Sequence, residues 1–221
     1  MDVEAEYSRL RQGAHRGWGG GNYQRRLAGW TATAQELFQN GGFPRAPAHI
    51  LELGSGNGMV SSLFAEQGYR VQGVELSQEA VEWARDRFAS AGLAGSFHQG
   101  DVCSMPYFED GTFDAVIDGN CLHCVIGEDR SRCLAEVRRV LRAGGIFVVS
   151  TMCGEPKSEE TRAQFDPQAH LLMAEGRPSR TLMSVEALKN ELAQAGFQEL
   201  SSRVSTNPWW DHLTMVTRMV G

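Results

Sequence analysis

The sequence has no excess of positive charge and very few lysines. Asp and Glu number 27 against 21 Lys and Arg, so the formal net charge at pH 7 is −6. Lys157 and Lys189 are the only lysines, and arginine supplies nearly all of the positive charge. A nucleic-acid-binding domain normally carries a basic surface that meets the phosphates. The composition therefore gives no support for a nucleic-acid partner.

Segments typical of membrane insertion or export are also missing. No apolar run approaches the ~20 residues that a helix needs to cross a bilayer. Residues 1–6, Met-Asp-Val-Glu-Ala-Glu, are acidic and lack the apolar core of a signal peptide. The odd number of cysteines, five, then indicates reduced thiols rather than a disulfide framework. We expect a cytoplasmic protein with no membrane partner.

The most informative stretch spans residues 50–75. Its apolar start, 50–53, precedes a loop, 54–58, with the sequence Gly-Ser-Gly-Asn-Gly. A short apolar run bounded by glycines is typical of a buried parallel strand. Glycines let the following turn approach a ligand closely, because no Cβ is in the way. A helical pattern then extends to Gly68, and a second strand ends at Glu75.

Glu75 follows the loop at the distance of one strand-helix-strand unit. In nucleotide-binding sheets, an acid at this position accepts hydrogen bonds from the hydroxyls of a ribose. The glycine triplet between strand and helix, with this acid correctly spaced, predicts a nucleoside pocket. A nicotinamide-binding motif expects Gly-x-Gly-x-x-Gly, and here Gly58 comes one residue early. The spacing therefore disfavours a nicotinamide cofactor.

This stretch resembles motif I and the following acidic motif of class I S-adenosylmethionine-dependent methyltransferases. The matching positions are Glu52, Gly54, Gly56, Gly58 and Glu75. The resemblance implies an α/β, Rossmann-like fold: a seven-stranded, mostly parallel sheet with helices on both faces and a C-terminal antiparallel hairpin. It also implies S-adenosyl-L-methionine as the cofactor.

The resemblance divides the chain into two regions. Residues 48–221 correspond to the methyltransferase domain, and residues 1–47 to an N-terminal tail and a covering helix. The first 21 residues fit either a mobile tail or a lid that orders over the pocket when cofactor binds. Residues 153–183 are polar and irregular, and a loop of this length predicts a substrate cap. No repeat or linker indicates a further domain.

The resemblance assigns further cofactor contacts to the ends of the second and third strands. Ser55 and Leu76 join the site beside the glycines and Glu75. Asp101 is expected to accept a hydrogen bond from the adenine amino group, and the backbone N–H of Val102 to meet the adenine ring. Asp101 follows a glycine and also fits a purely structural turn.

The fourth strand, 113–118, is expected to end beside the transferred methyl group, since ligands lie at the carboxyl ends of strands in open α/β sheets. The resemblance implies that Asp118, Gly119 and Asn120 contact the methionine portion of the cofactor, with backbone carbonyls as partners for its ammonium group. His123 is the candidate catalytic base, because the unperturbed pKa of histidine lies close to neutrality. His123 fits equally well a residue that only shapes the pocket.

Cysteines surround the candidate base. Cys121 and Cys124 flank His123, and Cys153 follows the neighbouring strand. Thiolates prefer soft ions, so a soft-metal site is one interpretation and inert buried cysteines are the other. A structural zinc site needs four ligands at regular spacing, which this segment does not provide. We therefore assign no metal ligand.

The expected activity is methyl transfer to an O, N or S nucleophile of a small molecule. The chain lacks the Asp/Asn-Pro-Pro-Tyr/Phe segment after the fourth strand that is used on planar amino groups of bases, which disfavours a nucleic-acid substrate. In the predicted cap, His170, Arg177 and Arg180 either bind an anionic acceptor or remain solvated. Two alternatives stay open: a non-catalytic cofactor-binding partner subunit, and a nicotinamide-dependent oxidoreductase. The sequence does not define the oligomeric state.

Overall fold

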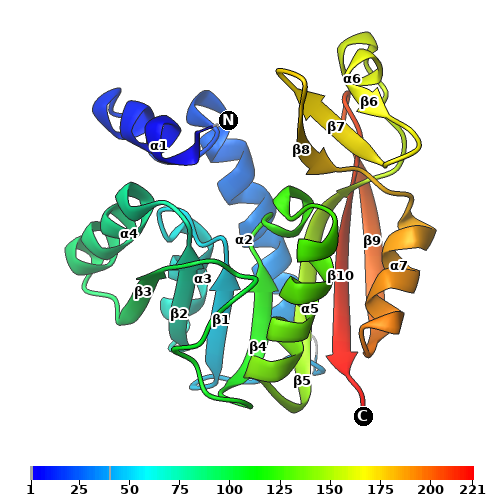
Figure 1. Cartoon of the computed structure of the whole chain (residues 1–221). Helices are drawn as coiled ribbons and strands as arrows, with labels where there is room; N and C mark the ends of the chain where they lie inside the picture. Colours follow the sequence, from blue (N-terminus) through cyan, green and yellow to red (C-terminus); the bar gives the residue numbers. More distant parts are fainter. Residues whose placement is uncertain (1, 40) are drawn as a thin grey trace.

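A seven-stranded sheet forms the centre of the computed structural model, which describes residues 2–39 and 41–221. Its strands are β1 (His49–Leu53), β2 (Arg70–Glu75), β3 (Gly95–Gln99), β4 (Phe113–Asp118), β5 (Leu141–Cys153), β9 (Phe197–Thr206) and β10 (Asp211–Met219). The order across the sheet is β3-β2-β1-β4-β5-β10-β9 (Figure 1). Strands β1 to β5 are parallel, whereas β10 is antiparallel to β5 and β9. The predicted Rossmann-like sheet with a closing hairpin is confirmed.

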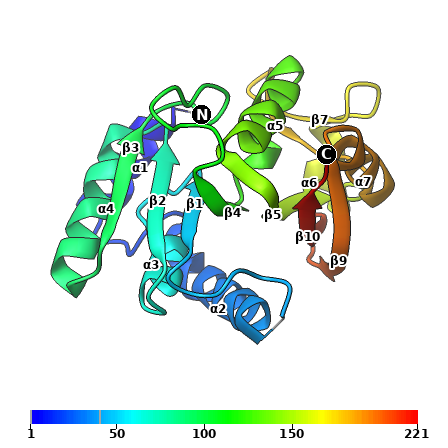
Figure 2. The same cartoon turned by 90° about the horizontal axis from the view of Figure 1, so that it is seen from below.

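Helices cover both faces of the sheet, as the view from below makes clear (Figure 2). They are α2 (Tyr23–Gln39), α3 (Met59–Ala65), α4 (Gln78–Ala91), α5 (Glu128–Val140) and α7 (Val185–Gln194). Successive residues of a strand point to opposite faces. In β1, Ile50 packs in a cluster with α2, α3 and α4, whereas Leu51 packs with α5 and α7. The near-continuous apolar strands of the sequence therefore become two cores, one on each face.

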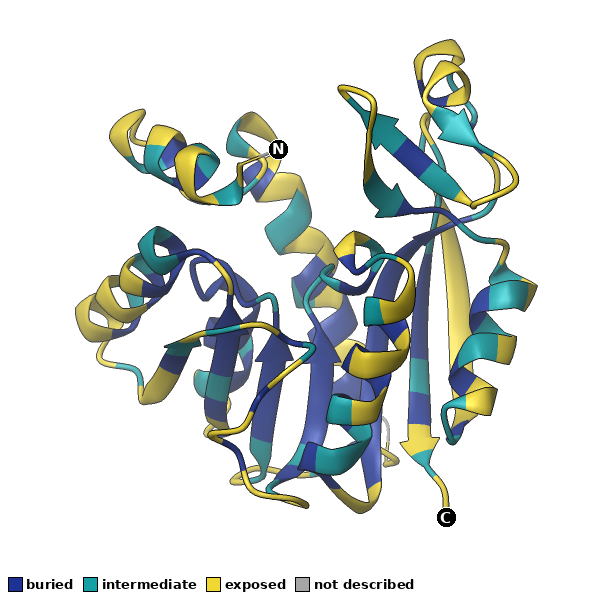
Figure 3. Cartoon of the chain, viewed as in Figure 1, coloured by how far each residue is buried: buried dark blue, intermediate teal, exposed yellow. Residues whose placement is uncertain are grey.

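Burial follows this arrangement, as Figure 3 shows. The central strands β1, β4 and β5 are almost entirely buried, whereas β9, at the edge of the sheet, is buried only at its first residue, Phe197. No helix in the described part of the chain is long and apolar enough to cross a membrane.

The N-terminal residues form a packed helix, α1 (Val3–Gln12), so the mobile-tail interpretation is wrong. Tyr7 and Leu10 of α1 are buried. Arg11 joins α1 to α4 through an ion pair with Glu79, with Nη1 and Oε1 2.8 Å apart. The helix lies above the carboxyl ends of the parallel strands (Figure 1). A short 3-10 turn, η1 (Gly20–Asn22), leads from this region into α2.

The segment 153–183 is structured and not an irregular loop. It contains α6 (Glu159–Ala163) and the strands β6 (Phe165–Asp166), β7 (Leu171–Ala174) and β8 (Arg177–Thr181), which form a separate antiparallel sheet of three strands. Leu172, Leu182 and Met152 make its small core. With so few buried positions, these short strands carry little apolar alternation in the sequence. The small sheet stands at the same end of the main sheet as α1 (Figure 1).

Candidate active site

A cavity of about 630 Å³ opens at the carboxyl ends of β1, β2 and β4. Its volume lies within the roughly 300–1,000 Å³ of typical ligand pockets. Residues from α1, α2 and β8 contribute to its walls, so it lies beneath the N-terminal helix and beside the small sheet. It brings together most of the predicted site residues: Glu52, Gly54, Ser55, Gly56, Glu75, Leu76, Asp101, Val102, Gly119, Asn120 and His123.

Gly58 and Asp118 do not line this cavity, contrary to the expectation. Gly58 caps α3 with a φ of 73°, and a Cβ there would meet Phe97 at 3.2 Å. The Asp118 carboxylate is fully buried and accepts hydrogen bonds from the N–H groups of Cys121 at 2.6 Å and Leu122 at 2.9 Å. The Gly58 backbone and the Asp118 side chain therefore support the loops behind the cavity instead of facing a cofactor.

Glu75 presents its carboxylate to the cavity from the end of β2. One oxygen accepts a hydrogen bond from the N–H of Gly56 at 2.9 Å, and the other from the N–H of Ser77 at 3.0 Å. Gly56 has a φ of 51°, and a Cβ there would lie 2.5 Å from the Tyr7 hydroxyl. Each carboxylate oxygen can accept more than one hydrogen bond. Glu75 can therefore receive the hydroxyls of a sugar from the cavity side.

Ser55 adds an unsatisfied polar atom to this wall. Ser55 lines the cavity, and its buried hydroxyl has no hydrogen-bond partner within residues 2–39 and 41–221. Buried polar atoms in native proteins nearly always have a partner, so an orphaned hydroxyl at a cavity points to a polar ligand. Together with Glu75 and the close backbone at Gly56, it fits the sugar of a nucleoside.

Glu52 lies deeper, at the end of β1. Its Oε2 atom accepts hydrogen bonds from the N–H of Ser61 at 2.8 Å and from the Ser61 hydroxyl at 2.5 Å. A Cβ on Gly119 would lie 2.5 Å from Oε1, so only glycine leaves this carboxyl room. Burial raises the pKa of Glu52 to about 8, against the lowering effect of the Ser61 hydrogen bonds. A nearby cation favours the ionised form of such a group, so this side of the cavity fits a cationic ligand.

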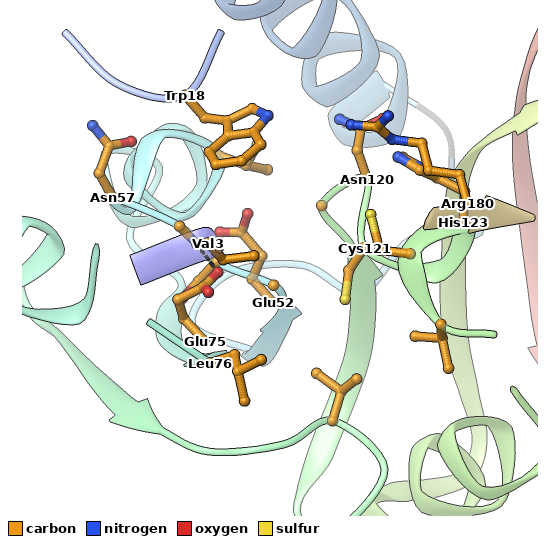
Figure 4. A pocket seen from close by; sticks show the side chains of 18 of the residues that line it. Val3, Trp18, Glu52, Asn57, Glu75, Leu76, Asn120, Cys121, His123 and Arg180 are labelled. Atoms are coloured by element: carbon orange, nitrogen blue, oxygen red, sulfur yellow. Dashed lines mark hydrogen bonds between the residues drawn. The ribbon is translucent and has the colours of Figure 1, made fainter. Parts of the chain in front are cut away.

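The opposite side of the cavity carries basic residues, as Figure 4 shows for Arg180 and His123 facing Glu52 and Glu75. His123 belongs to a short 3-10 helix, η2 (Leu122–Cys124). Burial and, next, the charge of Arg180 hold the pKa of His123 well below its usual value. Burial and the charge of Arg26 lower the pKa of His212 to about 4. Both imidazoles are therefore neutral at pH 7 and able to accept a proton.

Several lining residues were not predicted from the sequence. They are Val3, Tyr7, Trp18, Arg26, Asn57, Met59 and His212. A signal for α1 was present: Asp2 is an N-cap whose side chain accepts from the Ala5 N–H at 3.1 Å, and Val3, Tyr7 and Leu10 share a helical face. No comparable signal marked Arg26 or His212, because they reach the cavity only through the packing of α2 and β10 against the rest of the fold.

The other predicted residues separate into lining and surface positions. Arg180 lines the cavity, whereas His170 and Arg177 are exposed and do not. Cys121 and Cys124 also line it, and Cys153 is buried. Within residues 2–39 and 41–221, no group of three or more His, Cys, Asp or Glu side chains could hold a metal ion.

Comparison with known proteins agrees with this geometry. The sequence model of a family described as "Methyltransferase domain" matches residues 51–149. Norajmaline N-methyltransferase from Rauvolfia serpentina is 33% identical over 108 residues, which cover 48% of this chain and 36% of that protein. Ubiquinone/menaquinone biosynthesis C-methyltransferase UbiE from Desulfotalea psychrophila is 38% identical over 98 residues, 43% of this chain and 38% of that protein. Over these segments the chain is similar to S-adenosylmethionine-dependent methyltransferases.

A solved structure is similar in fold to this chain over its whole length. The crystal structure of 1,6-didemethyltoxoflavin-N1-methyltransferase from Burkholderia thailandensis, with bound 1,6-didemethyltoxoflavin and S-adenosylhomocysteine, has a TM-score of 0.70 and 21% identity, covering 100% of this chain and 92% of that one. At this identity the likeness shows the class I fold alone. The matched segments span only 36% and 38% of the two curated relatives. The family model begins after α1 and ends before the small sheet. It therefore includes the glycine-rich loop and Glu75 but neither α1 nor residues 153–183, which cover the cavity.

Proposed function

We propose that this protein transfers the methyl group of S-adenosyl-L-methionine to an O, N or S atom of a small molecule. The observation that supports this proposal is one cavity lined by the Glu75 carboxylate and by Ser55, whose hydroxyl has no partner among the described residues, with a neutral histidine on the other side. The cofactor supplies a methyl group that its sulfonium already makes electrophilic. The chain must therefore orient the acceptor, exclude water and take up a proton, where positioning alone can contribute about 7–11 kcal/mol in favourable cases.

In this proposal the acids hold the cofactor. Glu75 accepts from the ribose hydroxyls, and Ser55 pairs with a further polar atom of the same ligand. Asp101 and Val102 line the cavity and contact the adenine in this proposal. The backbones of Gly119 and Asn120 contact the methionine portion. The deep carboxyl of Glu52 balances the cationic charge of the ligand. Nothing in this arrangement favours a nicotinamide cofactor.

His123 is the proposed catalytic base. It lines the cavity, and its Nδ1 atom is buried without a hydrogen-bond partner among the described residues. Burial and, next, the charge of Arg180 lower the pKa of His123, so the ring is in the neutral form that a general base requires. Such a base contributes roughly 10²–10⁴-fold to a rate.

The two coverings support a small acceptor. We propose that α1 acts as a lid over the cofactor side and that residues 153–183 act as the substrate cap, because Val3, Tyr7 and Arg180 enter the cavity from these elements. The names of two of the compared proteins include small molecules, norajmaline and 1,6-didemethyltoxoflavin. All five cysteines are free, consistent with the cytoplasmic location that we propose.

The test is formation of S-adenosylhomocysteine from S-adenosyl-L-methionine in the presence of a panel of O, N and S nucleophiles. We expect at least one acceptor to be turned over, and His123→Ala to slow that turnover while leaving cofactor affinity unchanged. A protein that binds the cofactor but forms no S-adenosylhomocysteine with any acceptor would instead be a non-catalytic cofactor-binding subunit.

A further inference from the structure

Arg26 and Arg180 line the cavity and lack acidic partners. Within residues 2–39 and 41–221, neither guanidinium has a carboxylate oxygen within 4.0 Å. Seven other arginines are paired with acids: Arg9, Arg11, Arg130, Arg132, Arg139, Arg142 and Arg203. Several surface arginines also lack an acid among the described residues, but Arg26 and Arg180 are the ones that line the cavity. A partly buried guanidinium without an anion is costly, because its lost hydration is not replaced.

The two arginines act on the same small region. Burial lowers the pKa of Arg26, as does the charge of Arg180, against the raising effects of Tyr7 and Cys124. Both guanidinium charges also depress the pKa of His123. Because both side chains line the same cavity, an anion bound between them would relieve their mutual repulsion.

The charges of the cavity are therefore separated. Glu52 and Glu75 lie on the side where the cationic cofactor is proposed to bind, and Arg180 and His123 lie on the other (Figure 4). The lining also includes Tyr23, Met152 and Trp210, which offer apolar and aromatic surface. The acceptor side thus combines unpaired positive charge with flat apolar contacts.

We propose that the methyl acceptor is a small carboxylic acid whose carboxylate is held jointly by Arg26 and Arg180. This inference rests on the proposed methyl transfer and adds the acceptor class to it. The planar guanidinium matches the two oxygens of a carboxylate in bidentate geometry. Since Arg26 comes from α2 and Arg180 from β8, the bound carboxylate would also join the covering helix to the cap.

The experiment is calorimetric titration of the protein saturated with S-adenosylhomocysteine, using benzoate, benzamide and inorganic phosphate as separate probes. We expect benzoate to bind at least about tenfold more tightly than benzamide, the size of effect of one charge-assisted hydrogen bond. Arg26→Met and Arg180→Met should each weaken benzoate binding by at least about tenfold. Arg180→Lys should lose part of the affinity for benzoate. Lysine keeps the positive charge but lacks the planar guanidinium, whose parallel N–H groups match a carboxylate.

Arg177→Met is the matched control, since Arg177 lies on the same strand as Arg180 but is exposed and outside the cavity. Affinity for S-adenosylhomocysteine reports whether each variant keeps its cofactor side intact. Equal binding of benzoate and benzamide, or unchanged benzoate binding in both cavity variants, overturns the inference. Tighter binding of phosphate than of benzoate overturns the carboxylate class in favour of phosphate esters. If the protein does not bind S-adenosylhomocysteine, the proposed function fails, and this inference fails with it.

Discussion

Among single residues, Glu75 combines a structural role with the proposed role in ribose binding. It accepts hydrogen bonds from the N–H groups of Gly56 and Ser77, which fix the glycine-rich loop against the end of β2. Burial raises its pKa, and these backbone hydrogen bonds oppose the rise. The same carboxylate is thereby held ready for a sugar, with no rearrangement needed when the ligand arrives.

Glu75→Ala is expected to weaken S-adenosyl-L-methionine binding by about tenfold to a hundredfold. Hydrogen bonds to charged groups contribute roughly 1.5–3 kcal/mol, and each 1.4 kcal/mol is tenfold in affinity. Titration calorimetry measures the change. Glu66→Ala is the control, because Glu66 is exposed beyond the end of α3. An unchanged dissociation constant in Glu75→Ala would remove the ribose assignment.

Among the elements, α1 packs over the cavity through Tyr7 and Leu10 and is joined to α4 by a few polar contacts. Arg11 joins it to Glu79 and Asp86 of α4, and Glu4 accepts a hydrogen bond from the Glu79 N–H at 3.2 Å. Exposed ion pairs contribute only about 0–1 kcal/mol each. The helix can therefore open without unfolding the sheet, as a lid requires.

Arg11→Ala is expected to raise the dissociation constant for S-adenosylhomocysteine about twofold to fivefold. The variant loses the ion pairs between α1 and α4, which contribute ~0.5–1 kcal/mol to holding α1 over the cavity. Hydrogen exchange of residues 3–12 should accelerate in the same variant. Arg9→Ala should change neither quantity, because Arg9 pairs only with Glu6 on its own helix, at 2.6 Å. Equal behaviour of the two variants would contradict the lid.

Arg130 connects three elements behind the candidate base. From α5 it donates to the carboxylate of Glu191 in α7 at 2.7 and 2.6 Å, and to the Leu122 carbonyl of η2 at 2.7 Å. Its side chain is 7% exposed, so this is one of the few largely buried charges in the chain. Arg130 thus positions the segment that carries His123.

Arg130→Met is expected to lower kcat about tenfold while the affinity for S-adenosyl-L-methionine stays unchanged, because His123 moves and Glu75 does not. Stability should fall by about 2–3 kcal/mol, less than for a fully buried pair since Glu191 is partly exposed. For a chain of this length the melting temperature would then drop by roughly 4–10 °C. Arg132→Met, on the exposed face of the same helix, should leave kcat and melting temperature unchanged. Loss of cofactor affinity together with kcat would contradict the positioning role.

For the molecule as a whole, buried acids and histidines make stability depend on pH in opposite directions. The pKa of His212, lowered to about 4 from 6.5, means that the unfolded chain binds more protons below pH 6.5, so stability rises with pH there. The pKa of Asp118, raised to about 6 from 3.8, acts in the reverse sense below pH 6. The pKa of Glu52, raised to about 8 from 4.5, makes stability fall as pH rises toward 8.

Between pH 6.5 and 8 the Glu52 effect is the larger one, because the His212 effect fades as the unfolded imidazole loses its proton. We therefore expect the free energy of unfolding of the cofactor-free protein to decline across that interval, and Glu52→Gln to remove the decline. Urea denaturation at several pH values measures both. A wild-type protein whose stability is constant between pH 6.5 and 8 would show that Glu52 is already ionised.

The sheet and the cofactor side were predictable because their signals are local. Gly54, Gly56 and Glu75 lie within one strand-helix-strand unit, so sequence spacing alone brings them together. The acceptor side was largely hidden, because Arg26 and His212 are almost the length of the chain apart and meet only through packing. Short partly buried strands, such as β7 and β8, also escaped detection, since they lack a clear alternating pattern.

A crystal structure of the protein with S-adenosylhomocysteine tests the central claim most directly. We predict that the adenosyl group lies across the carboxyl ends of β1, β2 and β4, with its ribose hydroxyls within hydrogen-bonding distance of the Glu75 carboxylate. Ligand density away from Glu75, or a cavity closed by side chains of α1 with the ligand elsewhere, would contradict it.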